Sequence, residues 1–213
     1  MTRPRILLVG AGGHARACID VIECEGRFTI GGCIDAAVSA GATVLGHAVL
    51  GDDASLAALR ATYDVALVAI GHVGDCAPRR RLVAALEQQG YALPTIVSPR
   101  AHVSRHATVG RGTIVMHDAV IGPSARVGSH CIVNTRALIE HDATVGDDCH
   151  VATGAILNGG VRLGAGVFVG SGAVIRPGVQ VHDGAFITMG ARVLRDVTAA
   201  QRVALPAMTQ VWQ

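Results

Sequence analysis

The stretch VSPRAHVSRHATVGRGTIV, residues 97–115, begins a six-residue repeat that decides the fold. Val, Ile or Leu occupies every sixth position from Val97 to Val193 without a gap. A second column, two residues earlier in each repeat, holds only small residues from Thr95 to Ala191. Residues two apart point to the same side of an extended strand, so both columns face inward. Such a repeat is typical of a parallel β-helix, and three repeats make one triangular coil of eighteen residues. We expect roughly five and a half coils and a prism on the order of 27 Å long.

The residues before this repeat have a different pattern. Short apolar runs at 6–9, 28–34 and 65–70 alternate with helical patterns at 15–25, 53–60 and 78–89. Alternating strands and helices predict a small parallel α/β sheet. We therefore expect two domains, an α/β domain at residues 1–96 and a β-helix at residues 97–213.

Composition and charge exclude several classes of protein. The net charge is only +2, and Arg79-Arg80-Arg81 is the single basic run, so nucleic-acid binding has no electrostatic support. No segment approaches the eighteen apolar residues of a membrane span, and the N-terminus lacks a signal-peptide pattern, so we expect a cytoplasmic protein. The six cysteines form no CxxC pair, and Cys131 and Cys149 are expected as reduced core residues on adjacent coils.

A glycine-rich turn, GAGGHA at residues 10–15, follows the first predicted strand. It reads G-x-G-x-x-A, and Asp35 stands where the dinucleotide fingerprint has its acidic residue. Glycines allow close backbone approach, and a helix N-terminus favours a phosphate. The domain is too short for both halves of a dinucleotide site, so the turn predicts one nucleotide group rather than NAD. The alternative is a tight strand-to-helix turn without a ligand.

The combination of GAGGHA, the hexapeptide repeats, Ile139-Glu140-His141-Asp142 and His150 resembles one bacterial family. These are the nucleotide-sugar N-acyltransferases with a left-handed β-helix, which are related to sialic acid O-acetyltransferases. The resemblance covers nearly the whole chain and is greatest to the perosamine N-acetyltransferases. Those acetylate the 4-amino group of a GDP-linked 4-amino-4,6-dideoxy sugar, and UDP-linked sugars are the next best match. The chain has Ala204-Leu205-Pro206-Ala207 where the family often has Gly-x-Pro-Ala.

The resemblance implies an acetyl-CoA-dependent enzyme of surface polysaccharide synthesis that forms a homotrimer and uses no metal. It implies that His141 is the general base and Asp142 its carboxylate partner, with Glu140 as the alternative from the sequence. The remaining implied contacts fall into two sets. Acetyl-CoA would contact His150, Gly159, Ser171 and Met189. The nucleotide sugar would contact Gly12, Gly13, His14, Asp35 and Gly71.

Stacking arithmetic gives independent expectations for these positions. His141 follows Ile139 by two residues, at a corner, so its side chain should leave the prism. Gly159 lies eighteen residues later, directly above it, and leaves space for a ligand. Thr135, Thr153, Ser171 and Met189 are also eighteen apart and predict a lane parallel to the axis. A histidine suits the deprotonation of a sugar amine because its unperturbed pKa is near neutral.

Three other functions remain open from the sequence. A sialic-acid-type sugar O-acetyltransferase would share the fold, the CoA and the base. A metal hydratase needs three histidines converging on zinc, which His141 and His150 do not match because they should lie on different faces. A non-enzymatic trimeric scaffold would leave the GAGGHA domain unexplained.

Overall fold

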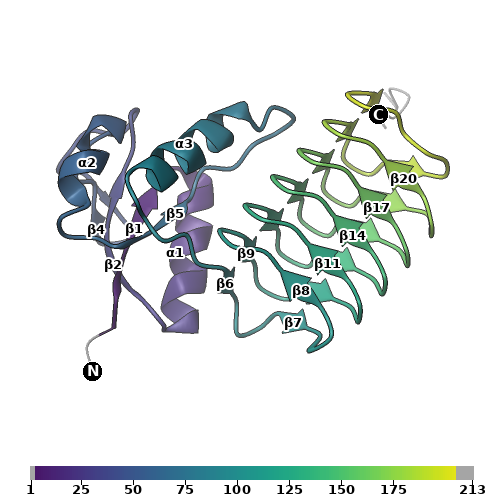
Figure 1. Cartoon of the computed structure of the whole chain (residues 1–213), viewed down its shortest axis with the longest axis horizontal. Helices are drawn as coiled ribbons and strands as arrows, with labels where there is room; N and C mark the ends of the chain where they lie inside the picture. Colours follow the sequence, from purple (N-terminus) through teal and green to yellow (C-terminus); the bar gives the residue numbers. More distant parts are fainter. Residues whose placement is uncertain (1–2, 205–213) are drawn as a thin grey trace, which may run out of the picture.

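The structure is a computed structural model that describes residues 3–204. Its N-terminal part is a three-stranded parallel sheet in the order β2-β1-β5, flanked by helices (Figure 1). The elements are β1 (Arg5–Val9), α1 (Gly13–Glu25), β2 (Thr29–Ile34), β3 (Thr43–Val44), β4 (His47–Ala48), η1 (Asp53–Ser55), α2 (Leu56–Leu59), β5 (Val65–Val68) and α3 (Ala77–Gln88). This is the small parallel α/β sheet that the sequence predicts.

The central strand β1 explains why helices cover both faces of this sheet. Successive residues of a strand point to opposite faces. Ile6 and Leu8 belong to the core cluster that includes α1, whereas Leu7 and Val9 belong to the cluster that includes α2 and α3. Two details differ from the prediction. The antiparallel pair β3–β4 was not expected, and the helix expected at 53–60 is a 3-10 turn followed by the short α2.

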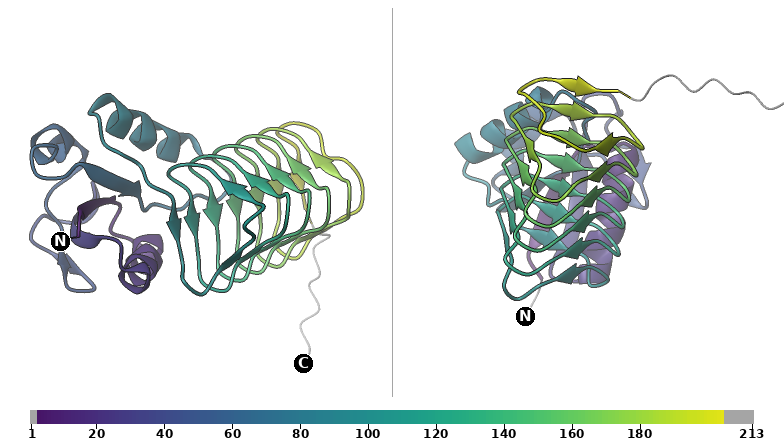
Figure 2. Two further views of the ribbon diagram at one scale, coloured as in Figure 1. Left: turned by 60° about the horizontal axis from the view of Figure 1, so that its bottom comes forward. Right: turned by 90° about the vertical axis from the view of Figure 1, so that its right-hand side faces the viewer.

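The remainder of the described chain is a parallel β-solenoid of about six turns, as the repeat predicts (Figure 2). Its two-residue strands stack into three sheets, one for each side of a triangular prism. The docked face comprises β6 (Ile96–Val97), β9 (Ile114–Val115), β12 (Ile132–Val133), β15 (His150–Val151), β18 (Phe168–Val169), β21 (Phe186–Ile187) and β23 (Arg202–Val203). The apolar open face comprises β7 (His102–Val103), β10 (Val120–Ile121), β13 (Leu138–Ile139), β16 (Ile156–Leu157), β19 (Val174–Ile175) and β22 (Arg192–Val193). The polar open face comprises β8 (Thr108–Val109), β11 (Arg126–Val127), β14 (Thr144–Val145), β17 (Arg162–Leu163) and β20 (Gln180–Val181).

A second six-residue period sets the corners of the prism. Every sixth residue from Gly112 to Gly190 has a positive φ, between 58° and 74°. Eight of these fourteen residues are glycine, which adopts this left-handed conformation without steric cost. Asp142 is one of the others, with φ 61°, so its conformation belongs to the regular corner and is not a local distortion at a site.

The docked face takes its name from the N-terminal domain that covers it. Its outward side chains Ile96, Ile114 and Ile132 are fully buried in the same core cluster as α1. Higher up, the buried Arg79 of α3 donates to the backbone oxygens of Val68, Ile70 and His130, and so joins the domain to the solenoid. The N-terminal domain and the solenoid are therefore joined by apolar packing near α1 and by hydrogen bonds from Arg79.

No other segment of residues 3–204 covers the other two faces, and their outward side chains differ in kind. The polar open face presents exposed Thr, Arg and Gln residues, at Thr108, Arg126, Thr144, Arg162 and Gln180. The apolar open face presents a stripe of partly or fully exposed aliphatic residues, at Val120, Leu138, Ile156 and Val174. A row of aliphatic side chains left open on one face is a feature of association surfaces.

Three further points complete the description of the fold. Within residues 3–204, no helix combines the length and the apolarity needed to cross a bilayer. Cys131 and Cys149 are free and buried on adjacent coils, as expected. The sequence departure at Ala204-Leu205-Pro206-Ala207 lies outside the described residues from position 205 onward.

Candidate active site

The glycine-rich turn joins β1 to α1 and is held in place by β2. Gly10 has φ 124°, and a Cβ there would lie 2.7 Å from Ile70 Cγ2, so only glycine fits. The Asp35 carboxylate accepts from the backbone N–H of Ala11 at 2.7 Å and from that of Ala37 at 2.8 Å. Gly12 and Gly13 face open space, because a Cβ on either would meet nothing within 4 Å. The turn therefore presents exposed backbone at the N-terminus of a thirteen-residue helix, a suitable place for an anion.

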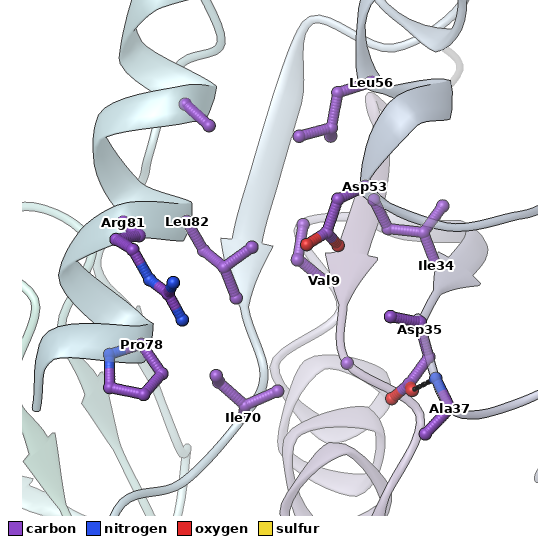
Figure 3. A pocket seen from close by; sticks show the side chains of 13 residues that line it. Val9, Ile34, Asp35, Ala37, Asp53, Leu56, Ile70, Pro78, Arg81 and Leu82 are labelled. Atoms are coloured by element: carbon purple, nitrogen blue, oxygen red, sulfur yellow. Dashed lines mark hydrogen bonds between the residues drawn. The ribbon is translucent and has the colours of Figure 1, made fainter. Parts of the chain in front are cut away.

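A cavity of about 500 Å³ opens beside this turn, between the ends of β1, β2 and β5 and helix α3 (Figure 3). Its volume falls within the range of small-molecule sites. Among the residues predicted for the substrate, Asp35 lines it, together with Gly10 of the same turn. Asp53 and Arg81 also line it, and neither was predicted from the sequence, because they come from segments separated from the turn by about forty to seventy positions.

His14 and Gly71 meet on the other side of the turn. A Cβ on Gly71 would lie 3.6 Å from the Cβ of His14, so the predicted pair is in contact. The His14 ring lies 6.4 Å from the ring of His150, and the His72 ring lies 5.3 Å from it. Three histidines are thus gathered where the N-terminal domain meets the docked face, and sequence reasoning missed His72.

Burial dominates the electrostatics of this cluster. Desolvation, together with the nearby positive charge of Arg79, lowers the pKa of His14 and His72 to about 3. Burial also lowers the pKa of His150 to about 4. Both ring nitrogens of His72 and Nε2 of His14 are buried and have no hydrogen-bond partner within residues 3–204. The lowered pKa values keep these imidazoles neutral at physiological pH, with buried ring nitrogens that remain unpaired among the described residues.

The hydrogen bonds of His150 define its tautomer. Nδ1 lies 2.8 Å from the carbonyl oxygen of His72, so it carries the proton and donates. Nε2 then accepts from Asn134 Nδ2 at 3.2 Å. His150 is only 7% exposed, and both of its nitrogens are engaged. His150 is therefore a buried member of the histidine cluster, in contact with His72, and does not lie on an open surface.

His141 lies on a corner of the prism and projects outward, with 61% of its side chain exposed. Its Nδ1 lies 2.8 Å from the Asp142 carboxylate. Glu140 instead accepts from the backbone N–H of His141, at 3.4 Å. The carboxylate that contacts the imidazole is therefore that of Asp142. Nδ1–H donates to Asp142, which leaves the Nε2 lone pair free to take a proton.

Gly159 lies against the His141 ring from one coil above. A Cβ at this position would lie 2.6 Å from both Cε1 and Nε2 of His141. The hydrogen bond to Asp142 raises the pKa of His141, in contrast to the lowered values of the buried cluster. This corner therefore provides an oriented imidazole that packs against the backbone of Gly159, where any side chain would clash with the ring.

The predicted acetyl-CoA contacts do not form one lane within a single chain. Gly159 shares the corner of His141, between the apolar and the polar open faces. Ser171 and Met189 lie at the opposite edge of the apolar open face, where it meets the docked face, and are exposed there. The Ser171–Met189 lane exists as the stacking arithmetic predicts, and Gly159, twelve residues before Ser171, lies on a different corner. His150 lies on the docked face and Asn134 at its edge, so both are on the Ser171–Met189 side of the prism and not on the His141 side.

One cluster of potential metal ligands lies at α1. Within residues 3–204, one group, Asp20, Cys24 and His117, has ligand atoms within 4.8 Å of one another. His117 Nε2 is already paired with Asp20 at 2.8 Å, and its Nδ1 with Ser98 Oγ at 2.6 Å. This group contains one histidine, not the three that a zinc hydratase of this type needs.

Comparisons with known families match both parts of the chain. The sequence profile of the PglD N-terminal domain matches residues 5–86. The profile of the bacterial transferase hexapeptide (six repeats) matches residues 160–195. A comparison with curated proteins gives no match.

Several solved structures resemble the whole chain. The H141N mutant of perosamine N-acetyltransferase from Caulobacter crescentus, in complex with CoA and GDP-perosamine, is 31% identical over 94% of this chain and 93% of its own, with a TM-score of 0.89. The acetyltransferase domain of PglB from Neisseria gonorrhoeae is 28% identical over 94% of this chain and 96% of its own, with a TM-score of 0.85. WeeI from Acinetobacter baumannii is 23% identical over 94% of this chain and 96% of its own, with a TM-score of 0.85, and shows the same fold.

Proposed function

Because the chain belongs to the family of hexapeptide-repeat acetyltransferases with a PglD-type N-terminal domain, which includes perosamine N-acetyltransferase, we propose that it acetylates a nucleotide-linked amino sugar. The acetyl group comes from acetyl-CoA, and the acceptor is the 4-amino group of a 4-amino-4,6-dideoxy sugar. GDP-perosamine is the first choice, since a relative that is 31% identical was solved with it and with CoA. A UDP-linked sugar is second. The enzyme acts in the cytoplasm, and its product is a precursor for the synthesis of a surface polysaccharide or glycan.

The observation that carries this proposal is the His141–Asp142 pair beside Gly159. An imidazole with Nδ1–H fixed on a carboxylate presents Nε2 as a base of defined direction. With 61% of its side chain exposed, the imidazole leaves room for the thioester and the amine on its solvent side. A metal ion is not needed for this chemistry, and neither is a nucleophilic serine or cysteine.

The reaction is a direct transfer. The neutral sugar amine attacks the thioester carbonyl of acetyl-CoA, which forms the C–N bond. His141 Nε2 takes the proton that the attacking nitrogen loses, and Asp142 stabilises the resulting imidazolium. The tetrahedral intermediate then collapses, the C–S bond breaks, and the leaving thiolate of CoA takes up a proton. The products are the N-acetyl sugar nucleotide and CoA.

The nucleotide sugar binds in the N-terminal domain, which we propose as residues 1–96. Gly12 and Gly13 hold the diphosphate at the N-terminus of α1, and Asp35 holds the ribose. His14 and Gly71 border the sugar end of the site. In this arrangement the orphan ring nitrogens of His14 and His72 contact the sugar, whose hydroxyl groups supply the missing partners.

We propose a homotrimer of left-handed β-helices, residues 97–213, that pack by their apolar open faces. The aliphatic stripe along Leu138, Ile156 and Val174 is the uncovered surface that such packing buries. The two corners that flank this face carry different parts of the site, His141 on one and Ser171 on the other. In a closed ring of three copies, one corner of each copy meets the other corner of the next. His141 of one copy then reaches the CoA lane and the histidine cluster of its neighbour, so the site is incomplete in a monomer.

A panel of sugar nucleotides tests the proposal. The enzyme is incubated with acetyl-CoA and GDP-, UDP- or dTDP-linked 4-amino-4,6-dideoxy sugars, and CoA release is followed with a thiol reagent. We expect turnover with an amino sugar and none with the corresponding 4-hydroxy sugar. Transfer only to hydroxyl groups would instead identify a sugar O-acetyltransferase of the sialic acid type. No transfer with any acceptor would reject the proposal.

A further inference from the structure

We propose that the 500 Å³ cavity is a guanine-specific site in which the Asp53 carboxylate reads the base. This inference rests on the proposed function, because it assigns the part of the nucleotide sugar that lies beyond the ribose. It adds a specificity-determining residue to that function, and explains how the enzyme would select one nucleotide from several.

The shape and lining of the cavity fit a flat aromatic base. Most of its wall is apolar, and the two sides face each other in Figure 3. Ile70 and Leu82 form one side, and Val9, Ile34 and Leu56 form the other. A nucleobase buries its two faces against such walls and directs its hydrogen-bonding edges to the rim. Specificity therefore has to come from the few charged groups at the rim.

The glycine-rich turn, Asp35 and Asp53 follow one another along the cavity in the same order as the phosphates, ribose and base of a nucleotide. Asp35 lies close to the glycine-rich turn, where the phosphates bind, and both of its oxygens already hold backbone N–H groups. Asp53 lies on the same side of the cavity but farther from α1, and its carboxylate points into the space (Figure 3). A ribose beside Asp35 thus places the base beside Asp53.

A carboxylate at this point discriminates among bases by simple complementarity. An ionised carboxylate only accepts hydrogen bonds, and its two oxygens suit two adjacent donors. Guanine alone has two adjacent donors on its pairing edge, N1–H and the 2-amino group. Uracil has a single N–H between two carbonyl oxygens, both of which would face the carboxylate oxygens. That mismatch leaves polar groups unpaired, which costs more than the lost bond.

Arg81 completes the recognition from the opposite wall. Its side chain enters the cavity from α3, across from Asp53 (Figure 3). Arginine carries only donors, and its commonest specific contact with guanine is to O6 and N7. A guanine that offers N1–H and the 2-amino group to Asp53 has O6 and N7 on the adjoining edge, where Arg81 can donate to them. The two charges are therefore complementary to the two sides of one base.

Calorimetry with nucleoside diphosphates tests this assignment on the full-length protein. We expect GDP to bind at least tenfold more tightly than UDP, and IDP, which lacks the 2-amino group, to be weaker than GDP. The Asp53→Asn variant should lose about 10- to 100-fold in GDP affinity, the usual value of a bidentate base contact. The preference for GDP over IDP should disappear in the same variant. XDP, which has a carbonyl oxygen in place of the amino group, should bind Asp53→Asn better than it binds the wild type, because asparagine supplies one acceptor and one donor.

The matched control is Asp52→Asn, which removes the same charge one residue earlier. Asp52 caps the 3-10 turn by accepting from the backbone N–H of Ala54 at 3.1 Å, and asparagine caps equally well. GDP affinity should be unchanged in this variant. If wild-type protein binds GDP but Asp53→Asn keeps both the affinity and the GDP-to-IDP ratio, the guanine site is rejected while the proposed function stands. If neither GDP nor UDP binds the wild type, both fail.

Discussion

His141 and His150 are nine residues apart on the same solenoid, yet their surroundings are opposite. His141 stands on a corner with most of its side chain in solvent, and a carboxylate raises its pKa. His150 lies on the docked face beneath the N-terminal domain, where burial lowers its pKa to about 4. One imidazole can exchange a proton near neutral pH, whereas the other is a fixed neutral donor and acceptor.

The difference shows that position around the prism, more than residue type, determines the chemistry of a side chain. A corner leaves the imidazole free to face another molecule, and Asp142 is placed beside it by the next corner position. The docked face removes water and gives each nitrogen of His150 one partner, His72 on one side and Asn134 on the other. The first setting suits the proposed base catalysis by His141, and the second suits a fixed residue that positions a ligand.

The strongest test of this comparison replaces the corner histidine. His141→Asn should lower kcat about 10²–10⁴-fold, the usual contribution of a positioned general base, because asparagine cannot take a proton. The residual rate should rise at high pH, where more of the sugar amine is neutral. Steady-state kinetics with the preferred sugar nucleotide measures both effects. The exposed His182→Asn variant is the control and should retain full activity. Near-normal kcat for His141→Asn at pH 7 would reject the assignment and make His150 the next candidate.

The second test separates the two open faces. Ile156→Arg places a charge in the aliphatic stripe and should convert the trimer to monomers. Activity should fall about 10²-fold, because His141 then loses the neighbouring lane that positions its substrates. Light scattering and kinetics on the same sample report the two effects. Thr144→Arg on the polar open face of a neighbouring coil should change neither. A wild-type monomer with full activity would contradict the shared site.

A smaller effect should follow from the carboxylate that distinguishes the two histidines. Asp142→Asn should lower kcat about 10- to 100-fold, less than His141→Asn, because Asp142 orients the base but does not receive the proton. The catalytic base must be neutral, so activity falls as the pH drops below the pKa of His141. Asp142 raises that pKa, so the acid limb of kcat/KM should lie above 6.5 in the wild type and move down in the variant. An unchanged acid limb would argue against this pairing.

The smallest expected effect concerns His72 in the buried histidine cluster and is measured as the pH dependence of the free energy of unfolding. Burial lowers the pKa of His72 from its ordinary 6.5 to about 3 in the folded protein, so between these values the unfolded chain binds a proton that the folded chain does not. Stability is therefore fully present above pH 6.5 and falls as the pH drops toward 3. His72→Phe should reduce this slope by about 1.4 kcal/mol per pH unit, measured by urea unfolding at several pH values. The exposed His182→Asn should not alter the slope. Equal slopes for His72→Phe and wild type would show that His72 is not held neutral.

The interior of the solenoid could be predicted from the sequence almost residue by residue, because its period is local. The aliphatic column from Val97 to Val193 coincides with the second residue of each strand from β6 to β22. The outward residues of those same strands repeat in character every eighteen residues. This longer repeat gives the prism one apolar, one polar and one covered face. That signal was in the sequence at Val120, Leu138, Ile156 and Val174, but inward columns alone do not reveal it.

The site was less accessible because it depends on contacts between distant segments. The spacing of eighteen placed Gly159 above His141 correctly, since stacking is repetitive. Gly159 and Ser171 are twelve residues apart, so the same spacing separates their columns, but only the order of the sheets shows that the two corners border one face. Asp53, Arg81 and His72 gave no local pattern, because their roles arise only where loops of the N-terminal domain converge.

The three-sided period also limits how this protein can change length during evolution. Inserting or deleting eighteen residues adds or removes one whole coil, and every later side chain keeps its face. Inserting six residues would instead turn all later coils by one face. Phe168 and Phe186, now on the docked face, would move to an open face, and the aliphatic stripe would be interrupted. Lengths of such chains should therefore differ in steps of eighteen, even though the sequence repeats every six.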